Sequence, residues 1–235
     1  MLGLATGITN TSYQWQPNMV GADLKLWLRN GVGVAVGQWD DSSGNANHAV
    51  QGTSGNQAVL AEGGLNFELD DESHYDLTDD IVIAAQEAFI VFLVCEREST
   101  SERMGILGVG SNNDFLEFTS DRKVRFNSVG SDDDQMQYDA GAFAADEKMI
   151  VTIQRESGST GLIKTFKNGS LLTVGTLATG DGNNTGAITF NTIANRNNNR
   201  HFDGIIHEML VYDTTDLTTA EINKVNNYLL NKHNL

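Results

Sequence analysis

Short segments of alternating apolar and polar residues, separated by turn-forming residues, dominate this 235-residue sequence. Runs such as LNFEL, KVRFN and AITFN are rich in β-branched and aromatic residues, and Gly, Asn, Asp or Ser bounds each of them. Runs of this kind form half-buried strands. About a dozen of them predict an all-β fold in which two antiparallel sheets pack as a jelly-roll sandwich.

Two local motifs support this reading. In LIKTFKNGSLLTV, Asn168 and Gly169 have the positive-φ preference of a two-residue type I′ hairpin turn. Near the chain end, Thr218 and Glu221 form a capping box, and Ile222, Val225 and Leu229 recur at helical spacing. We therefore expect one short C-terminal helix, closing an edge of the sandwich.

The domain organisation is expected to be simple. Residues 1–20 have no steady period and predict an irregular N-terminal arm, and residues 21–235 predict one sandwich domain. Pro17 is the only proline, and no Ser/Gly-rich or charged run is long enough for a linker. The start lacks the basic region of a secretory signal, and no apolar run reaches the ~18 residues of a membrane span.

The net charge of the chain limits the classes of molecule that it can bind. The chain has 15 Lys and Arg against 31 Asp and Glu, a formal net charge of −16. Such a field repels nucleic acid phosphates and anionic lipid surfaces, so neither nucleic acid nor membrane is an expected partner. The only cysteine, Cys95, lies inside the apolar run AFIVFLVC, which predicts a buried, inert thiol and no disulfide.

The stretch WDDSSGNANHAV, residues 39–50, is the first candidate site. Asp41, Ser43 and Asn45 present oxygen groups at alternate positions, as calcium loops begin. Gly52 stands where such a loop would end in a bidentate glutamate, so an ion would need ligands from elsewhere in the fold. The alternative is a turn in which these side chains hydrogen-bond their own backbone above Trp39 and His48. The turn is favoured, and calcium at this loop is the one cofactor we consider.

Two longer stretches resemble a known family. LKLWLRNGVGVAVGQWDDSSGNANHAVQ (24–51) is similar to the opening of concanavalin A-like, laminin-G/pentraxin-like jelly-roll domains. FDGIIHEMLVYDTTDLTTAEINKVNNYLLNKHN (202–234) is similar to their closing strand and helix. The resemblance implies the jelly-roll scaffold, whose members include lectins, glucanases and adhesion modules, and some relatives hold calcium near sheet edges. A scaffold of this breadth does not by itself imply an activity.

The stretch FELDDESHYD invites a second comparison with this family. Glu68, Asp70 and Glu72 alternate and would share one face of an extended strand, as the paired carboxylates of its glucanases do. Asp71 would then have to bury its charge, and no Trp-rich flank accompanies the motif. The resemblance to non-catalytic relatives implies a plain strand with Phe67 and Tyr75 directed inward. We therefore expect no catalytic residues and a protein that is not an enzyme.

Other polar stretches are less specific. Asp132, Asp133 and Asp134 predict a solvated hairpin tip, with a cation site as the alternative. The loop NRNNNRH (195–201) is a good turn-former that could also hydrogen-bond sugar hydroxyls or a neighbouring subunit. The five histidines have no metal-ligand spacing.

The resemblance also carries two functional hypotheses. Lone jelly-roll proteins of this size, rich in Asn, Gly and Thr, look like virion structural proteins of tailed bacteriophages. This implies a capsid decoration or fibre-associated module, assembled in the host cytoplasm onto other virion proteins and forming a homo-oligomer. The alternative is a lectin-like domain that recognises host surface glycans through loops at one end of the sandwich.

Overall fold

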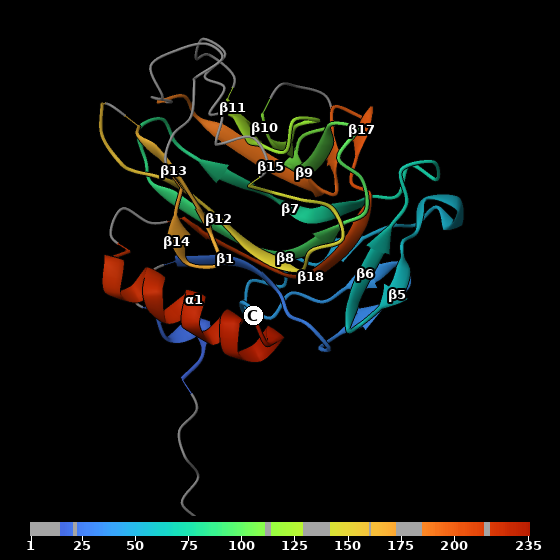
Figure 1. Ribbon diagram of the computed structural model, residues 1–235, viewed down its shortest axis with the longest axis horizontal. Helices are drawn as coiled ribbons and strands as arrows, with labels where there is room; N and C mark the ends of the chain where they lie inside the picture. The colour runs from blue at the N-terminus through green and yellow to red at the C-terminus, as the bar shows by residue number, and fades with distance from the viewer. Residues whose placement is uncertain are drawn as a thin grey trace, which may run out of the picture.

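Two large antiparallel sheets face each other, and one helix covers the outer surface of the first sheet (Figure 1). This computed structural model describes residues 15–20, 23–110, 114–128, 142–159, 161–172, 185–213 and 217–235. The expected all-β sandwich with a single C-terminal helix is confirmed within these residues. No helix in this part of the chain has the length and apolar character needed to cross a membrane.

The first sheet has eight strands in the order β14-β13-β12-β8-β18-β6-β5, and β1 also pairs with β18. The long strand β18 has β8 on one side and both β1 and β6 on the other. The strands are β1 (Asp23–Leu28), β5 (Val59–Ala61), β6 (Gly64–Phe67), β8 (Phe89–Arg97), β12 (Met149–Arg155), β13 (Ile163–Lys167), β14 (Ser170–Leu171) and β18 (Gly204–Asp213).

The second sheet has eight strands in the order β11-β10-β9-β15-β7-β4-β3-β2. They are β2 (Val34–Ala35), β3 (Gln38–Trp39), β4 (Ala49–Val50), β7 (Tyr75–Ile83), β9 (Met104–Gly108), β10 (Phe115–Phe118), β11 (Val124–Asn127) and β15 (Ile188–Ile193). A separate two-stranded hairpin, β16 (Asn195–Arg196) with β17 (Arg200–His201), packs against β9. Two single 3-10 turns are η1 (Pro17–Met19) and η2 (Ser54–Asn56).

Apolar side chains form two cores, one between the sheets and one outside the first sheet. Strand β8 contributes to both, because successive side chains of a strand point to opposite faces. Phe89 and Val91 belong to the inner core, whereas Ile90 and Phe92 belong to the outer one. This explains why its sequence is continuously apolar rather than alternating. Cys95 is fully buried in the inner core, and burial raises the pKa of its thiol to about 12, which confirms the expected inert thiol.

Helix α1 (Thr219–His233) begins and packs as its sequence predicts. The Thr218 side chain accepts a hydrogen bond from the Glu221 backbone, and the Glu221 carboxylate accepts one from the Thr218 backbone. The expected apolar face, Ile222, Val225 and Leu229, is buried in the outer core. The expectation that the helix closes an edge of the sandwich is wrong, because Trp27 of β1 and Phe92 of β8 give it an apolar sheet face to cover (Figure 1).

The predicted hairpin is also confirmed. Strands β13 and β14 pair across Asn168 and Gly169, whose φ angles are +49° and +77°, as a type I′ turn requires. The proposed arm is described only from residue 15 onward, where Pro17 packs at α1 and its carbonyl accepts a hydrogen bond from the Tyr212 hydroxyl. Its residues 1–14 lie outside the described residues, and the division at residue 20 stays a prediction.

Candidate functional site

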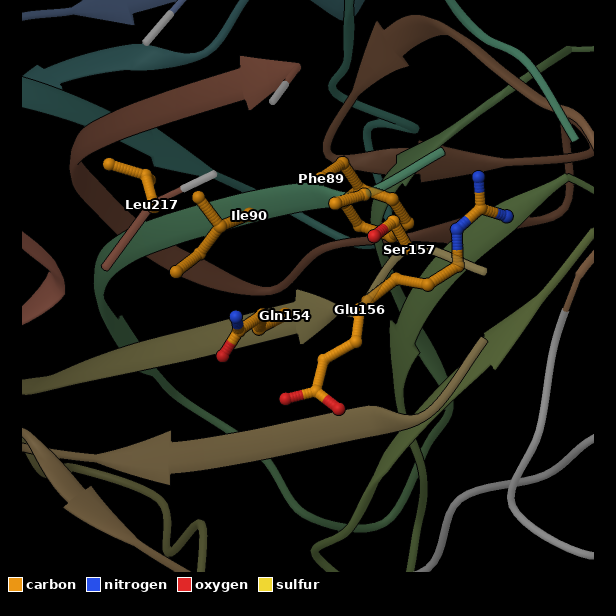
Figure 2. A pocket seen from close by; sticks show the side chains of 8 residues that line it. Phe89, Ile90, Gln154, Glu156, Ser157 and Leu217 are labelled. Carbon is orange, nitrogen blue, oxygen red and sulfur yellow. The ribbon is translucent and has the colours of Figure 1, made fainter. Parts of the chain in front are cut away.

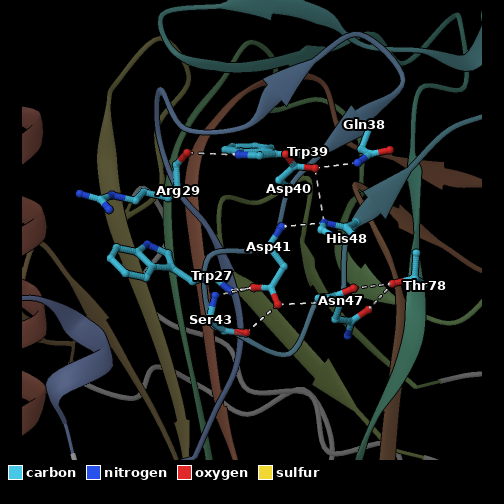
Figure 3. Close-up of polar contacts among 11 residues, drawn as sticks. Trp27, Arg29, Gln38, Trp39, Asp40, Asp41, Ser43, Asn47, His48 and Thr78 are labelled. Atoms are coloured by element: carbon cyan, nitrogen blue, oxygen red, sulfur yellow. Dashed lines mark hydrogen bonds and ion pairs between the residues drawn. The ribbon is translucent and has the colours of Figure 1, made fainter.

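The polar loop that follows β3 is organised around the carboxylate of Asp41 (Figure 3). One oxygen accepts hydrogen bonds from the backbone N–H of Trp27 at 2.9 Å and of Ser43 at 2.8 Å. The other oxygen accepts from the Ser43 hydroxyl at 2.6 Å and from the Asn47 backbone at 3.1 Å. The Asn45 amide nitrogen donates to the Leu24 carbonyl at 2.7 Å. The loop therefore has the hydrogen bonds of the self-bonded turn.

This geometry bears on the calcium hypothesis. Both Asp41 oxygens already accept two donors each, and Asn45 directs its nitrogen, not its oxygen, toward the loop. Within the described residues, no group of three His, Cys, Asp or Glu side chains is placed to hold a metal ion. The self-bonded turn stays the favoured interpretation, and calcium at Asp41, Ser43 and Asn45 stays the alternative that a solution measurement tests.

The same loop is fixed to strand β7 of the second sheet. The side-chain oxygen of Asn47 accepts hydrogen bonds from the Asp79 backbone at 2.9 Å and from the Thr78 hydroxyl at 3.3 Å (Figure 3). Asp41 joins the loop to β1 of the first sheet, and Asn47 joins it to the second. The loop thus holds the two sheets together beside β7.

The asparagine-rich stretch 195–201 forms the β16–β17 hairpin on the outer surface of β9. Asn197 and Asn198 at its tip have φ angles of +53° and +50°, which asparagine adopts more readily than most residues. The hairpin lies so close to β9 that a Cβ atom on Gly105 would be 2.4 Å from the Asn195 carbonyl carbon. Glycine at 105 is therefore required for the hairpin to approach the sheet.

A buried ion triad holds the hairpin in place. The fully buried Glu117 of β10 pairs with Arg196 of the hairpin at 2.8 Å and with Arg125 of β11 at 3.3 Å. The Arg196 guanidinium also lies 3.5 Å from the centre of the Phe115 ring. A buried carboxylate is tolerated because two cations neutralise it. This triad was not expected from the sequence, because Arg196 is 79 positions from Glu117 and Arg125 faces Glu117 only through the pairing of β10 with β11.

Strand β7 lies between these two polar elements and forms the floor of two hollows on the outer face of the second sheet. The lining of one, of about 500 Å³, includes His74 and the hairpin residue Asn198. The other, of about 250 Å³, is lined by Asn45 and Asn47 of the loop. Asp80 lines both hollows. The two loops that the sequence singled out therefore border two neighbouring hollows that share Asp80, here together called the β7 groove.

The lining of the β7 groove is mostly polar and rigidly supported. On β7, Leu77 and Ile81 are buried in the inner core, whereas Asp76, Asp79 and Asp80 are exposed, and the strand is bulged between Asp76 and Ile81. On the neighbouring strand β15, the side-chain oxygen of Asn191 is buried without a hydrogen-bond partner among the described residues. The complete linings are His74, Asp76, Leu77, Asp80, Val109, Gly110, Asn191, Thr192 and Asn198 for the larger hollow, and Lys25, Asn45, Asn47, Asp79, Asp80, Ile81 and Val82 for the smaller.

The carboxylates of FELDDESHYD are not aligned on one strand face. Residues 68–73 form a turn closed by the Ser73 N–H and the Glu68 carbonyl at 3.2 Å, so Asp70 and Glu72 lie outside β6 and β7. Burial and the nearby charges of Glu98, Asp203 and Asp71 raise the pKa of Glu68. The expected inward pair is confirmed, since Phe67 and Tyr75 are buried edge-to-face with ring centres 5.7 Å apart. Asp132, Asp133 and Asp134 lie outside the described residues.

Two other hollows are less suited to a ligand. One of about 320 Å³ lies at the ends of β8 and β12, where Gln154, Glu156 and Ser157 line it (Figure 2). Its buried Arg155 already donates to the backbone carbonyls of Ala84, Glu87 and Gly186.

The other, of about 650 Å³, lies beside α1, with Trp15 and Tyr228 edge-to-face at 6.1 Å. Tyr228 also packs edge-to-face on Trp27, and Lys232 there is paired with the buried Glu208 at 2.7 Å. These groups fasten the helix to the sheet.

Comparison with known proteins identifies the fold. No family model matches the sequence, and a search of curated proteins finds no match either. Among solved structures, the chain is similar to the binding domain of Paraclostridial mosquitocidal protein 1, with a TM-score of 0.61 and 14% identity over 92% of this chain. It is also similar to the botulinum neurotoxin serotype D binding domain, with a TM-score of 0.59 and 15% identity over 91% of this chain. A Trypanosoma rangeli sialidase matches with a TM-score of 0.57 and 15% identity over 89% of this chain.

These similarities show the fold alone, of the concanavalin-like jelly-roll type that the sequence resemblance implied. The chain covers 54% and 53% of the two toxin binding domains and 33% of the sialidase. Nothing in these comparisons links the chain to bacteriophages.

One expectation is overturned by this comparison. The sequence analysis expected a protein that is not an enzyme, yet the structural neighbours include sialidases, which are enzymes. The absence of a local catalytic motif was insufficient ground, because one fold supports both catalytic and binding sites built from distant residues. At 13–15% identity and about a third of their length, the sialidases assign no reaction to this chain.

Proposed function

We propose that this chain binds carbohydrate in the β7 groove. The observation that carries the proposal is the convergence of two polar loops, 41–47 and 195–201, on either side of one strand. Together with β7 they line hollows of about 500 and 250 Å³ with amide, hydroxyl and carboxylate groups.

The chemistry of the lining suits sugar hydroxyls, each of which both donates and accepts a hydrogen bond. Asp76 and Asp80 offer acceptors, and Asn191 and Asn198 offer both kinds of group. Asn191 also lines the larger hollow, where its side-chain oxygen has no hydrogen-bond partner among the described residues. The exposed side chain of Val82 suits the C–H face of a sugar ring.

Solved structures of the same fold support a binding role on this scaffold. They include two toxin binding domains and a sialidase in complex with sialic acid, of which this chain covers 32%. Because identity is 15% or lower, the support concerns the scaffold and not individual residues.

A glycan array with the purified protein tests the proposal, and selective binding is the expected result. Asn198→Gly removes a lining side chain without straining the positive φ of this position, and it should weaken binding. The matched control is Asn197→Gly, which changes a neighbour of the same φ that does not line the groove. Binding that is equally affected by both variants, or by neither, would place the site elsewhere.

A role on a virion is a separate proposal, in which the chain is assembled in a host cytoplasm and docks on other virion proteins or on copies of itself. What favours a docking surface is edge strand β5, where Val59 and Leu60 are 60% and 51% exposed. Exposed apolar edge strands pair readily with other chains. Mass spectrometry of purified particles should detect the chain, and Val59→Lys should reduce its self-association in light scattering. Absence from the particles would remove the virion role and leave sugar binding untouched.

A further inference from the structure

The β7 groove has an unbalanced charge. Asp76 and Asp80 line its larger hollow, and Asp79 and Asp80 line its smaller one. All three residues are exposed, and their carboxylates have no hydrogen bond or ion pair within the described part of the chain. Acidic side chains elsewhere, such as Asp41, Glu117 and Glu208, are committed to structural partners. The groove therefore presents three carboxylates that are available to a ligand.

Positive charge near these carboxylates is scarce. Lys25 is the one lysine or arginine among the described residues that line the groove, and its ammonium lies 3.7 Å from the Asp213 carboxylate. The hairpin carries two arginines, Arg196 and Arg200, and neither lines the groove. Arg196 is turned into the buried triad with Glu117. Sugar carboxylates and sulfates are recognised by guanidinium forks or clustered cations, and the groove has neither.

From this lining we infer that the β7 groove selects oligosaccharides without negative charge, either neutral or amino sugars, and rejects sialylated and sulfated ones. The inference rests on the proposed carbohydrate-binding function and adds its specificity. Carboxylates accept hydrogen bonds from sugar hydroxyls and pair with a protonated amino group, whereas they repel an acidic sugar. One like charge near 4 Å in water changes an equilibrium about fivefold, so three exposed carboxylates discriminate strongly.

The size of the groove favours a chain over a single sugar. The linings of the two hollows run along the chain from His74 to Val82, with a bulge of β7 between Asp76 and Ile81, which pair with Thr192 and Phe190 of β15. Asp80 lies where the two hollows meet. A bound oligosaccharide would therefore pass this carboxylate, which makes Asp80 the position most sensitive to ligand charge.

The test compares glycans that share a core and differ only in charge. On an array, we expect signals from neutral or amino glycans and at least tenfold weaker signals from sialylated and sulfated versions of the same cores, about two like-charge contacts. Asp80→Asn should reduce this ratio about fivefold, and high salt should reduce it further. The control Glu98→Gln removes an equal charge from an exposed residue outside the groove and should leave the ratio unchanged.

The outcomes separate the two proposals. Equal binding of acidic and neutral versions of one core, or a ratio that Asp80→Asn leaves unchanged, overturns the charge selection while sugar binding stands. Silence from every glycan class overturns the proposed function and the inference with it. Circular dichroism of Asp80→Asn checks that this surface change leaves the sandwich intact.

Discussion

Replacing Asp41 by asparagine tests whether the 41–47 loop is a structural connection between the two sheets. Asparagine has nearly the same shape, but it replaces one acceptor oxygen by an NH₂ group that faces donors. If that group takes the place of the second oxygen, it faces the Ser43 hydroxyl and the Asn47 backbone N–H, at 2.6 and 3.1 Å in the parent. The bonds from Trp27 and Ser43 to the remaining oxygen lose their charge assistance.

The cost follows from these contacts. Hydrogen bonds to a charged group contribute about 1.5–3 kcal/mol when buried, and those of Asp41 are part-buried. We expect Asp41→Asn to lower the free energy of unfolding by about 3 kcal/mol, which for a chain of this size lowers Tm by roughly 6–12 °C. Urea unfolding followed by tryptophan fluorescence measures it, since Trp27 and Trp39 flank the loop.

The matched control is Asp40→Asn. The Asp40 side chain is 49% exposed, lies 3.4 Å from His48 and accepts a hydrogen bond from the exposed Gln38 amide at 2.6 Å. Asparagine keeps an acceptor oxygen there, so Asp40→Asn should cost under about 0.5 kcal/mol. A cost for Asp41→Asn equal to that of Asp40→Asn would refute the structural reading of the loop.

Three further predictions follow from the same structure. His207 is 1% exposed without a hydrogen-bond partner in the described chain, and burial lowers its pKa to about 4. Because the unfolded state binds a proton first as the pH falls, the free energy of unfolding should fall by about 3 kcal/mol between pH 6.5 and 4. His207→Gln should flatten this part of a urea-denaturation pH series. Gly105→Ala should displace the β16–β17 hairpin and abolish glycan binding, whereas Gly52→Ala, with open space around its Cβ, should not. Calorimetry with calcium, compared with a chelated sample, should show no heat of binding and no change in Tm. A saturable heat of binding in the parent protein that disappears in Asp41→Asn would instead support the calcium site.

The sequence predicted what depends on local pattern. Alternation gave the sandwich, Asn168-Gly169 gave the hairpin, and Thr218 with Glu221 gave the start of the helix. The position of the helix on a sheet face was not predicted. It depends on the apolar side chains on both faces of β8, and the continuous apolar run was not recognised as a strand that is covered on both sides.

The groove was less accessible to sequence analysis. Its two walls were each noticed as polar loops, but their meeting at β7 depends on pairings such as Asn47 with Asp79. The hairpin wall of the groove is held in place by the ion pair of Glu117 with Arg196, which are 79 positions apart in the chain. Contacts at such separation leave no period or spacing in the chain, so the sequence could nominate the residues without bringing them together.

The two cores also have a consequence for how the molecule is presented. The segment at Pro17 and helix α1 lie together on the outer side of the first sheet, whereas the β7 groove opens on the outer side of the second. A carrier or surface joined at either of these segments would therefore be shielded from the groove by the full thickness of the sandwich. Copies immobilised in this way would all turn the face that carries the β7 groove outward, whichever of the two attachment points is used.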